Sequence, residues 1–205
     1  MHLHLHPDNP QARAIKTLVE GLQKGAVIVY PTDTVYGLGC DIFQHKAVER
    51  ICRIKNVDPK KAQLSFICAD LSDLSKYTKS ISTPMYRMLK SYLPGPFTFI
   101  LPASREVPKI LQSKKDTIGL RIPDNIIAQT IIRELGRPLL SASLPGDTVE
   151  ECTDPEVMHE KFGKLVDFVA NGGIGGITPS TIVDCTGDEP VITRQGLGIW
   201  NEEIA

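Results

Sequence analysis

Apolar residues recur at helical spacing in several separate segments of the chain. Leu18, Val19 and Leu22 lie on one face of a segment that begins at Pro10, with Asn9 or Asp8 as its cap, and stops at Gly25. The same spacing predicts a helix over 45–56, with a basic outer face. Further helices are expected at 71–77, capped by Ser72 or Asp70, and at 84–93, 125–135 and 155–162.

Short apolar or alternating runs between these helices predict strands. They cover 27–30, 64–68, 97–101, 117–123, 138–143, 166–170, 180–184 and 190–194. Helices and strands alternate without an internal repeat or a low-complexity linker, which predicts a single α/β domain over 1–205 with a mixed, twisted sheet. The longest irregular stretches are expected at 144–153 and at 171–179, "NGGIGGITP", whose four glycines favour close approach to a neighbouring segment.

Composition and charge narrow the function classes. The chain has 205 residues, 41% of them hydrophobic, which suits one domain with a sizeable core. The net charge of −1 gives no global attraction to nucleic acid or to an anionic membrane. The absence of a long apolar run and of a secretion signal predicts a cytoplasmic protein.

The cysteines and the N-terminal histidines are the candidate metal ligands. Five cysteines are scattered without a Cys-x-x-Cys pair, so buried free thiols are expected rather than disulfides or a zinc knuckle. The alternating "HLHLH" of residues 2–6 could hold a metal from one face of a strand. No acidic or Cys/His partners are near it in sequence, so a frayed terminus or an edge strand is predicted, and no metal site is assigned.

Small hydroxyl residues gather where the predicted strands begin or end. Ligands of open α/β sheets lie at strand ends, so this distribution predicts a ligand cavity there, although the same residues also form turns and caps. No dinucleotide fingerprint and no G-x-x-x-x-G-K-[ST] loop is present. The hydroxyl residues concerned are Thr32, Thr34, Thr117, Ser141, Ser143, Ser180 and Thr181.

Three cations are placed to serve such a cavity. Arg121 and Arg194 each lie in a strand-like segment with apolar neighbours, where a guanidinium must be paired, face a ligand or sit at a solvated edge. Lys55, at the end of the helix over 45–56, is the natural third cation, and it also suits a lysine that compensates the helix dipole. Two such arginines could bind a carboxylate and a phosphate.

With these residues assembled, the sequence resembles the YrdC-like family. The likeness runs from about Pro10 to Gly198 and rests on "YPTDTVYGLG", "LPGPFTFIL", "TIGLRIPD", "PLLSAS", "PSTIVD" and "VITRQG", in that order. Characterised members are threonylcarbamoyl-AMP synthases. The resemblance therefore implies a reaction of L-threonine, bicarbonate and ATP, with Mg²⁺, that yields threonylcarbamoyl-AMP and pyrophosphate for transfer RNA modification.

The resemblance also implies roles for individual residues. Thr32, Arg121, Ser141 and Ser180 would bind threonine, with Arg121 on its carboxylate. Lys55, Thr117, Ser143 and Arg194 would bind the nucleotide. No protein nucleophile is required, because adenylyl transfer depends on positioning and electrostatic stabilisation, and no residue is assigned a catalytic role.

The sequence departs from the family pattern at two positions. The family's Lys-x-Arg reads Lys55-Asn56-Val57, and its Ser-x-Asn reads Ser143-Leu144-Pro145. Each lost polar contact to a charged group would cost about 1.5–3 kcal/mol, which predicts weak or altered activity. This pattern resembles the YciO branch of the family.

An RNA-binding function is the alternative prediction. The helix face with Arg50, Arg53 and Lys55, followed by Lys60 and Lys61, is the strongest local basic patch, and it could contact the phosphates of double-stranded, ribosomal or transfer RNA. A solvated helix face would have the same composition.

Overall fold

Ten strands of the computed structural model, which describes residues 1–58, 64–111 and 116–201, form one mixed sheet. Their order across the sheet is β1-β8-β2-β3-β7-β4-β6-β5-β9-β10. The strands are β1 (His2–His4), β2 (Ile28–Tyr30), β3 (Gly37–Asp41), β4 (Ser65–Ile67), β5 (Phe97–Pro102), β6 (Thr117–Arg121), β7 (Leu139–Ser143), β8 (Phe168–Asn171), β9 (Thr181–Asp184) and β10 (Val191–Arg194).

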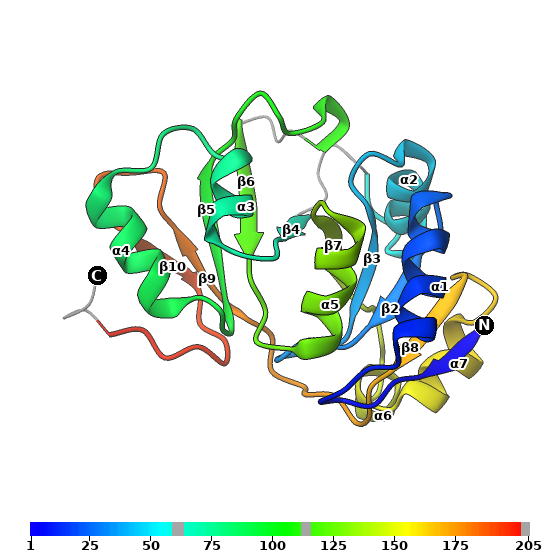
Figure 1. Cartoon of the computed structure of the whole chain (residues 1–205). Helices are drawn as coiled ribbons and strands as arrows, with labels where there is room; N and C mark the ends of the chain where they lie inside the picture. The colour runs from blue at the N-terminus through cyan, green and yellow to red at the C-terminus, as the bar shows by residue number, and fades with distance from the viewer. Residues whose placement is uncertain (59–63, 112–115, 202–205) are drawn as a thin grey trace.

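The sheet mixes parallel and antiparallel pairing of its strands. β8 pairs in parallel with both β1 and β2, β4 pairs in parallel with β6, and β5 pairs in parallel with β9. β3 pairs antiparallel with both β2 and β7. The pairs β7–β4, β5–β6 and β9–β10 are also antiparallel. The mixed sheet predicted from the sequence is therefore confirmed (Figure 1).

The helices begin and end close to the predicted positions. They are α1 (Ala12–Gln23), α2 (His45–Ile54), α3 (Leu71–Lys76), α4 (Thr83–Tyr92), α5 (Ile126–Leu135), α6 (Val149–Thr153) and α7 (Pro155–Phe162), with a 3₁₀ turn at Lys109–Leu111. Asp70 caps α3 by accepting the amide of Asp73, and Gly136 ends α5 with a φ of 73°, a left-handed conformation that glycine adopts without strain. No helix of the described residues is both long and apolar enough to cross a bilayer.

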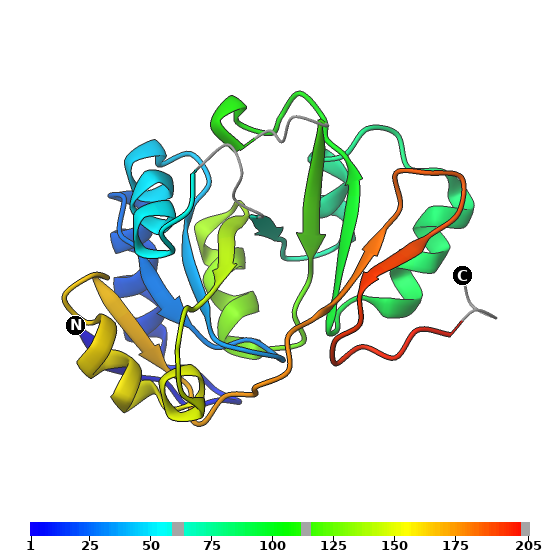
Figure 2. The ribbon, with the colours of Figure 1, turned by 180° about the vertical axis from the view of Figure 1, so that it is seen from behind.

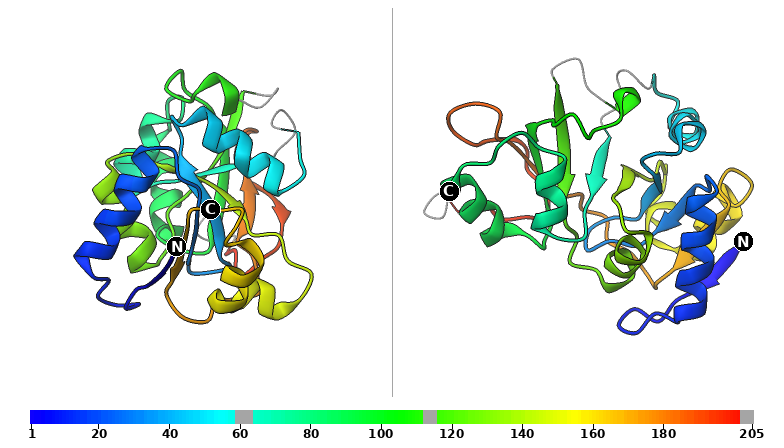
Figure 3. Two further views of the ribbon diagram at one scale, coloured as in Figure 1. Left: turned by 90° about the vertical axis from the view of Figure 1, so that its right-hand side faces the viewer. Right: turned by 45° about the horizontal axis from the view of Figure 1, so that its top comes forward.

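Two hydrophobic clusters, one on each face, hold the helices to the sheet. α1 and α5 pack side by side over Ile28, Tyr30 and Leu139 (Figure 1). The opposite face packs against α2 and α7 in the half of the sheet that contains β3 and β8, and against α3 and α4 in the half that contains β5 and β6. Figures 2 and 3 show that α4 lies at the end of the molecule remote from β8 and the N-terminus.

The face that α1 and α5 cover becomes polar farther across the sheet. Directly opposed residues of neighbouring strands share a face. Starting from the buried Ile28 of β2, the directly opposed residues on the successive strands β3, β7, β4 and β6 are Gly39, Ser141, Ser65 and Gly119. Small and polar residues therefore continue this face of the sheet across β3, β7, β4 and β6.

Three local predictions were wrong. Gly37–Asp41 forms β3, although its glycines suggested a loop, because it pairs with strands on both sides. The stretch 144–153, predicted to be irregular, contains α6, which a capping box of Thr148 and Glu151 begins. α1 starts at Ala12 after Gln11 and has no side-chain cap from Asn9 or Asp8.

Candidate substrate-binding site

The motif "YPTDTVYGLG" places a tyrosine ring over two glycines. Tyr30 ends β2 and lies opposite Gly37, with Gly39 two residues farther along β3. A Cβ atom on either glycine would come within 3.1 Å and 2.7 Å, respectively, of Cε1 of Tyr30, so only glycine leaves space for the ring. Burial raises the pKa of Tyr30 to about 12, and its hydroxyl donates to Oγ of Ser141 at 2.7 Å.

Thr32 organises the turn between β2 and β3. Its Oγ1 accepts a hydrogen bond from the amide of Thr34 at 3.1 Å and donates to the carbonyl of Val35 at 2.7 Å. The Oγ1 atoms of Thr32 and Thr34 are 3.2 Å apart. The turn thus holds a fixed pair of hydroxyl groups, and Thr34 lies beside Arg121 at the end of β6.

Arg121, the last residue of β6, lies against this turn and is 7% exposed. Its Nη2 donates to Oδ1 of Asp33 and, at 2.9 Å, to Oγ1 of Thr34. Among the described residues, Nε of Arg121 and Oδ2 of Asp33 are buried without a hydrogen-bond partner. The ion pair therefore leaves one donor and one acceptor unsatisfied, which is unusual because buried polar atoms normally have a partner.

Arg194 supplies a second cation near Arg121. Its Nε and Nη2 donate to the carbonyl of Ser180 at 3.1 Å and 2.7 Å, and Oγ of Ser180 is 2.8 Å from Oγ1 of Thr98. Burial, and secondarily the charge of Arg121, lowers the pKa of Arg194. Within the described part of the chain Arg194 has no carboxylate partner, so an anion between the two arginines would relieve their repulsion.

Lys55 and Ser143 meet at another edge of the site. Nζ of Lys55 donates to the carbonyl of Ser143 at 2.7 Å, and burial lowers the pKa of Lys55. Both departures from the family pattern lie here, because Val57 and Pro145 each follow one of these residues by two positions. Val57 is 38% exposed and makes no polar side-chain contact, as its chemistry requires. Thr117 begins β6, at the opposite end of that strand from Arg121, and the register through β4 places it at the same end of the sheet as Ser143.

The glycine-rich stretch 171–179 closes against the threonine turn. A Cβ atom on Gly176 would be 2.3 Å from the carbonyl oxygen of Thr34, and one on Gly175 would be 2.6 Å from the ring of Tyr36. The hydroxyl of Tyr36 donates to the carbonyl of Gly173 at 2.7 Å. The close approach predicted from these glycines is confirmed, and it braces the turn that holds Thr32 and Thr34.

The structure connects most of the predicted threonine-side residues and adds others. Thr34 contacts both Thr32 and Arg121 through its hydroxyl. Ser141 accepts a hydrogen bond from Tyr30, and Ser180 accepts one from Arg194. Sequence reasoning missed Tyr30, Asp33 and Thr98 as members of the site. Tyr30 and Asp33 lie within the motif "YPTDTVYGLG", so their place there was the available signal.

The basic patch is smaller than the sequence suggested. Nη1 of Arg50 donates to Oδ2 of Asp167 at 2.6 Å, and its Nε donates to the carbonyl of Leu165 at 2.9 Å. Arg50 is therefore engaged within the protein and is a poor candidate for a phosphate contact. Lys60 and Lys61 lie outside the described residues.

Comparison with known proteins gives relatives along almost the whole chain. The chain is 46% identical over 198 residues to the uncharacterized protein YciO of Escherichia coli K12, covering 95% of both chains. It is 33% identical to the threonylcarbamoyl-AMP synthase of Vibrio vulnificus YJ016, covering 89% of this chain and 98% of the relative.

Solved structures give the same result. The crystal structure of E. coli YciO superposes with a TM-score of 0.90 at 44% identity and covers 97% of both chains. The P. abyssi Sua5 structure complexed with L-threonine superposes with a TM-score of 0.86 at 28% identity and covers 96% of this chain and 57% of that one. The family model for Sua5, YciO and YrdC, described as "Telomere recombination", matches residues 20–196. The chain therefore belongs to the Sua5, YciO and YrdC family.

Proposed function

We propose that the chain binds L-threonine and ATP on the polar face of the sheet and, with bicarbonate, forms threonylcarbamoyl-AMP and pyrophosphate slowly. The observation that carries this proposal is the largely buried ion pair of Arg121 and Asp33, each with an unpartnered polar atom among the described residues. The relationship to threonylcarbamoyl-AMP synthases and to a Sua5 that binds L-threonine supports the choice of substrate.

An α-amino acid matches the two unpartnered atoms. Its carboxylate would accept from Nε of Arg121, while its amino group would donate to Oδ2 of Asp33. The hydroxyls of Thr32 and Thr34 lie next to this pair and could bond the threonine side chain. A site built to hydrogen-bond a hydroxyl discriminates strongly against a substrate that lacks it, so threonine is preferred over valine.

The nucleotide would lie toward Lys55, Thr117, Ser143 and Arg194. Lys55 is half-buried and Arg194 is exposed on the edge strand β10, and neither has a carboxylate partner within the described residues, so both are suitable for phosphate groups. The carboxylate that meets the threonine side of the site is Asp33, and it is held by Arg121. Mg²⁺ would therefore enter on the phosphates of ATP, which is its usual mode in such sites, and needs no protein carboxylate cluster.

Val57 and Pro145 account for the slow rate in this proposal. Both lie beside the Lys55 and Ser143 contact, where the phosphates would bind, while the contacts of the threonine side are intact. RNA binding remains a separate proposal, and the engagement of Arg50 by Asp167 takes away one of its expected contacts.

The test is pyrophosphate release in the presence of ATP, Mg²⁺ and bicarbonate. The wild type, Val57→Arg, Pro145→Asn and the double variant are compared with threonine, serine and valine as substrates. We expect threonine-dependent release that is slow in the wild type and fastest in the double variant, with coupled rather than additive gains because both groups would contact one intermediate. Equal release with all three amino acids, or none with any variant, would contradict the proposal.

A further inference from the structure

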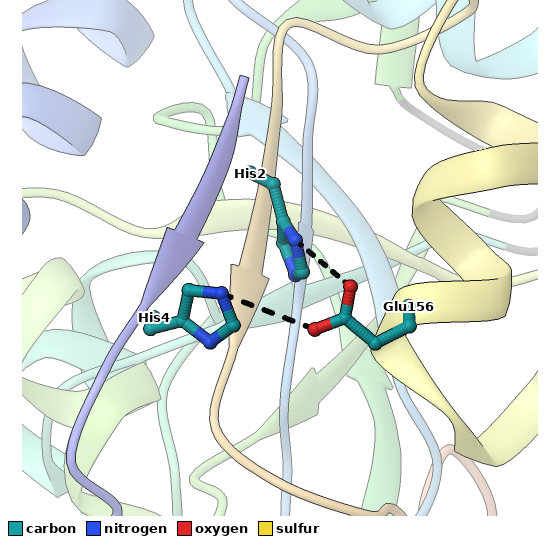
Figure 4. A group of neighbouring side chains, drawn as sticks. All are labelled: His2, His4 and Glu156. Carbon is teal, nitrogen blue, oxygen red and sulfur yellow. Dashed lines mark ion pairs between the residues drawn. The ribbon is translucent and has the colours of Figure 1, made fainter.

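The N-terminal strand brings two histidines to a glutamate from another part of the chain. β1 pairs in parallel with β8, and α7 lies beside that edge of the sheet (Figure 1). His2 and His4 are two residues apart on β1, so their side chains point to the same face. Glu156, in the first turn of α7, meets both of them (Figure 4). Sequence spacing alone could not place Glu156 there.

The three side chains present their donor atoms to one point. Oε2 of Glu156 is 3.3 Å from Nδ1 of His2, and Oε1 is 3.9 Å from Nε2 of His4. One ligand atom from each residue lies within 4.8 Å of the other two. Bonds of about 2.0–2.2 Å in a tetrahedral zinc site place ligand atoms about 3.3–3.6 Å apart, so a small rotation of the exposed His4 ring would complete that geometry.

Neighbouring groups hold these ligands in place. The ring of His159, one turn after Glu156 on α7, stacks on His2 with centroids 4.9 Å apart and planes 15° apart. Nδ2 of Asn171 donates to Oε1 of Glu156 at 3.2 Å and lies 3.3 Å from Nδ1 of His4. His159 thus packs within the cluster. In metal sites, hydrogen bonds and ring contacts from neighbouring side chains orient the residues that bind the ion.

An ordinary ion pair explains the cluster less well. Glu156 faces both rings with separate oxygen atoms, 3.3 Å from Nδ1 of His2 and 3.9 Å from Nε2 of His4, and the second distance is too long for a hydrogen bond. A single divalent cation would bind two imidazoles and the carboxylate at once, whereas a hydrogen bond serves one ring at a time. Side-chain exposures of 72% for His4 and 60% for Glu156 leave a route for the ion and a position for water.

We propose that His2, His4 and Glu156 form a binding site for one divalent transition-metal ion, zinc above all, at the junction of β1 and α7. Two imidazoles and a carboxylate suit zinc, cobalt, nickel and copper, whereas magnesium and calcium require oxygen ligands. The ion ties the N-terminal edge strand to α7. The site lies apart from the arginines of the substrate site and does not depend on the proposed reaction. It replaces the expectation, drawn from sequence neighbours alone, that no metal site exists here.

The test uses the full chain without a histidine tag, stripped of metal with a chelator. Titration calorimetry with zinc chloride measures stoichiometry and affinity, and the visible absorption of added cobalt reports its ligands. We expect one zinc per chain and a higher Tm with zinc, because a ligand that binds only the native state stabilises it. Each of His2→Gln, His4→Gln and Glu156→Gln should lower the affinity at least tenfold.

Two control variants keep this test specific. His6→Gln and His45→Gln remove histidines that are outside the cluster, so both should bind zinc as the wild type does. His4 and Glu156 are exposed, and their variants should retain the far-ultraviolet circular dichroism of the wild type. No zinc binding by the wild type, or undiminished binding by the folded His4→Gln and Glu156→Gln variants, would overturn the proposal.

Discussion

Two arginine–aspartate pairs in this protein differ in how completely they are satisfied. Arg137 donates from Nε and Nη2 to Oδ2 of Asp41, at 2.9 Å and 2.5 Å, and Oδ1 of Asp41 accepts the amide of Phe43 at 3.0 Å. Asp41 is 0% exposed, and both of its oxygens are used. The side chains of Arg121 and Asp33 are 8% and 11% exposed, yet each has a buried polar atom without a partner among the described residues.

The difference separates a structural ion pair from a candidate binding pair. The hydrogen bond to Asp41 raises the pKa of Arg137, as expected for a pair that needs no further ligand. Arg194, in the candidate site, has its pKa lowered by burial and by Arg121. Arg137, in the bend between α5 and β7, is therefore fully paired within the fold, whereas Arg121 and Arg194 lie near each other with hydrogen-bonding or charge left unsatisfied.

The largest expected effect is the loss of stability when the Arg137–Asp41 pair is broken. Arg137→Met leaves the fully buried Asp41 without its cation, and breaking a buried pair in this way costs about 3–5 kcal/mol of the free energy of unfolding. Urea unfolding measures the loss. Arg133→Met is the matched control, because Arg133 is exposed and its guanidinium bonds Gln129 of its own helix; its change should stay within about 0.5 kcal/mol. Threonine binding should be unaffected by either change.

Substitution of Arg121, in the unsatisfied pair, should affect threonine binding more than stability. Arg121→Met removes a guanidinium whose Nε is buried without a partner among the described residues, so the loss in stability should be smaller than for Arg137→Met. Threonine affinity, by contrast, should fall by about 1.5–3 kcal/mol, roughly tenfold to a hundredfold, because a charged hydrogen bond to the substrate carboxylate is lost. Titration calorimetry with threonine measures this, with Arg13→Met on the exposed face of α1 as control. If Arg121→Met and Arg137→Met lost the same free energy of unfolding, the two pairs would not differ as proposed.

The glycine-rich stretch that braces the candidate site can be tested separately. Gly176→Ala would place Cβ 2.3 Å from the carbonyl oxygen of Thr34, a contact that the backbone must move to relieve. Such overpacking costs about 1–3 kcal/mol in stability and should also weaken threonine binding. Gly187→Ala, whose nearest atom would be 3.9 Å away, is the control and should change neither quantity. A neutral Gly176→Ala would mean that the stretch does not support the turn.

The sequence predicted elements whose apolar period was clear. α5 and α7 were expected within one residue of their observed ends, because their apolar spacing and their terminal Asn, Gly or Pro agree. β3 was missed because Gly37 and Gly39 carry no strand signal of their own; pairing on both sides decides their conformation. The start of α6 was visible as Thr148 and Glu151 at capping-box spacing, and was overlooked.

Site residues could be predicted from the sequence where they lie in a single short motif. The apolar neighbours of Arg121 predicted a guanidinium that is paired, faces a ligand or sits at a solvated edge, and the structure shows it paired with Asp33. Its partner Asp33 is 88 residues away, and Glu156 is 154 residues from His2, so neither contact follows from spacing. Such pairs depend on the order of strands in the sheet, which local patterns do not determine.

The smallest expected effect concerns the hydroxyl that holds Arg121 in place. Oγ1 of Thr34 accepts from Nη2 of Arg121 at 2.9 Å, and Thr34 is 2% exposed. Thr34→Val keeps the shape of the side chain but removes this acceptor, so Arg121 would be held by Asp33 and the threonine affinity should fall by about 0.5–1.5 kcal/mol. Thr34→Ser keeps the hydroxyl and should bind nearly as the wild type does. Titration calorimetry of both variants distinguishes positioning from direct contact, because a loss in Thr34→Val as large as that in Arg121→Met would mean that Thr34 itself binds the substrate.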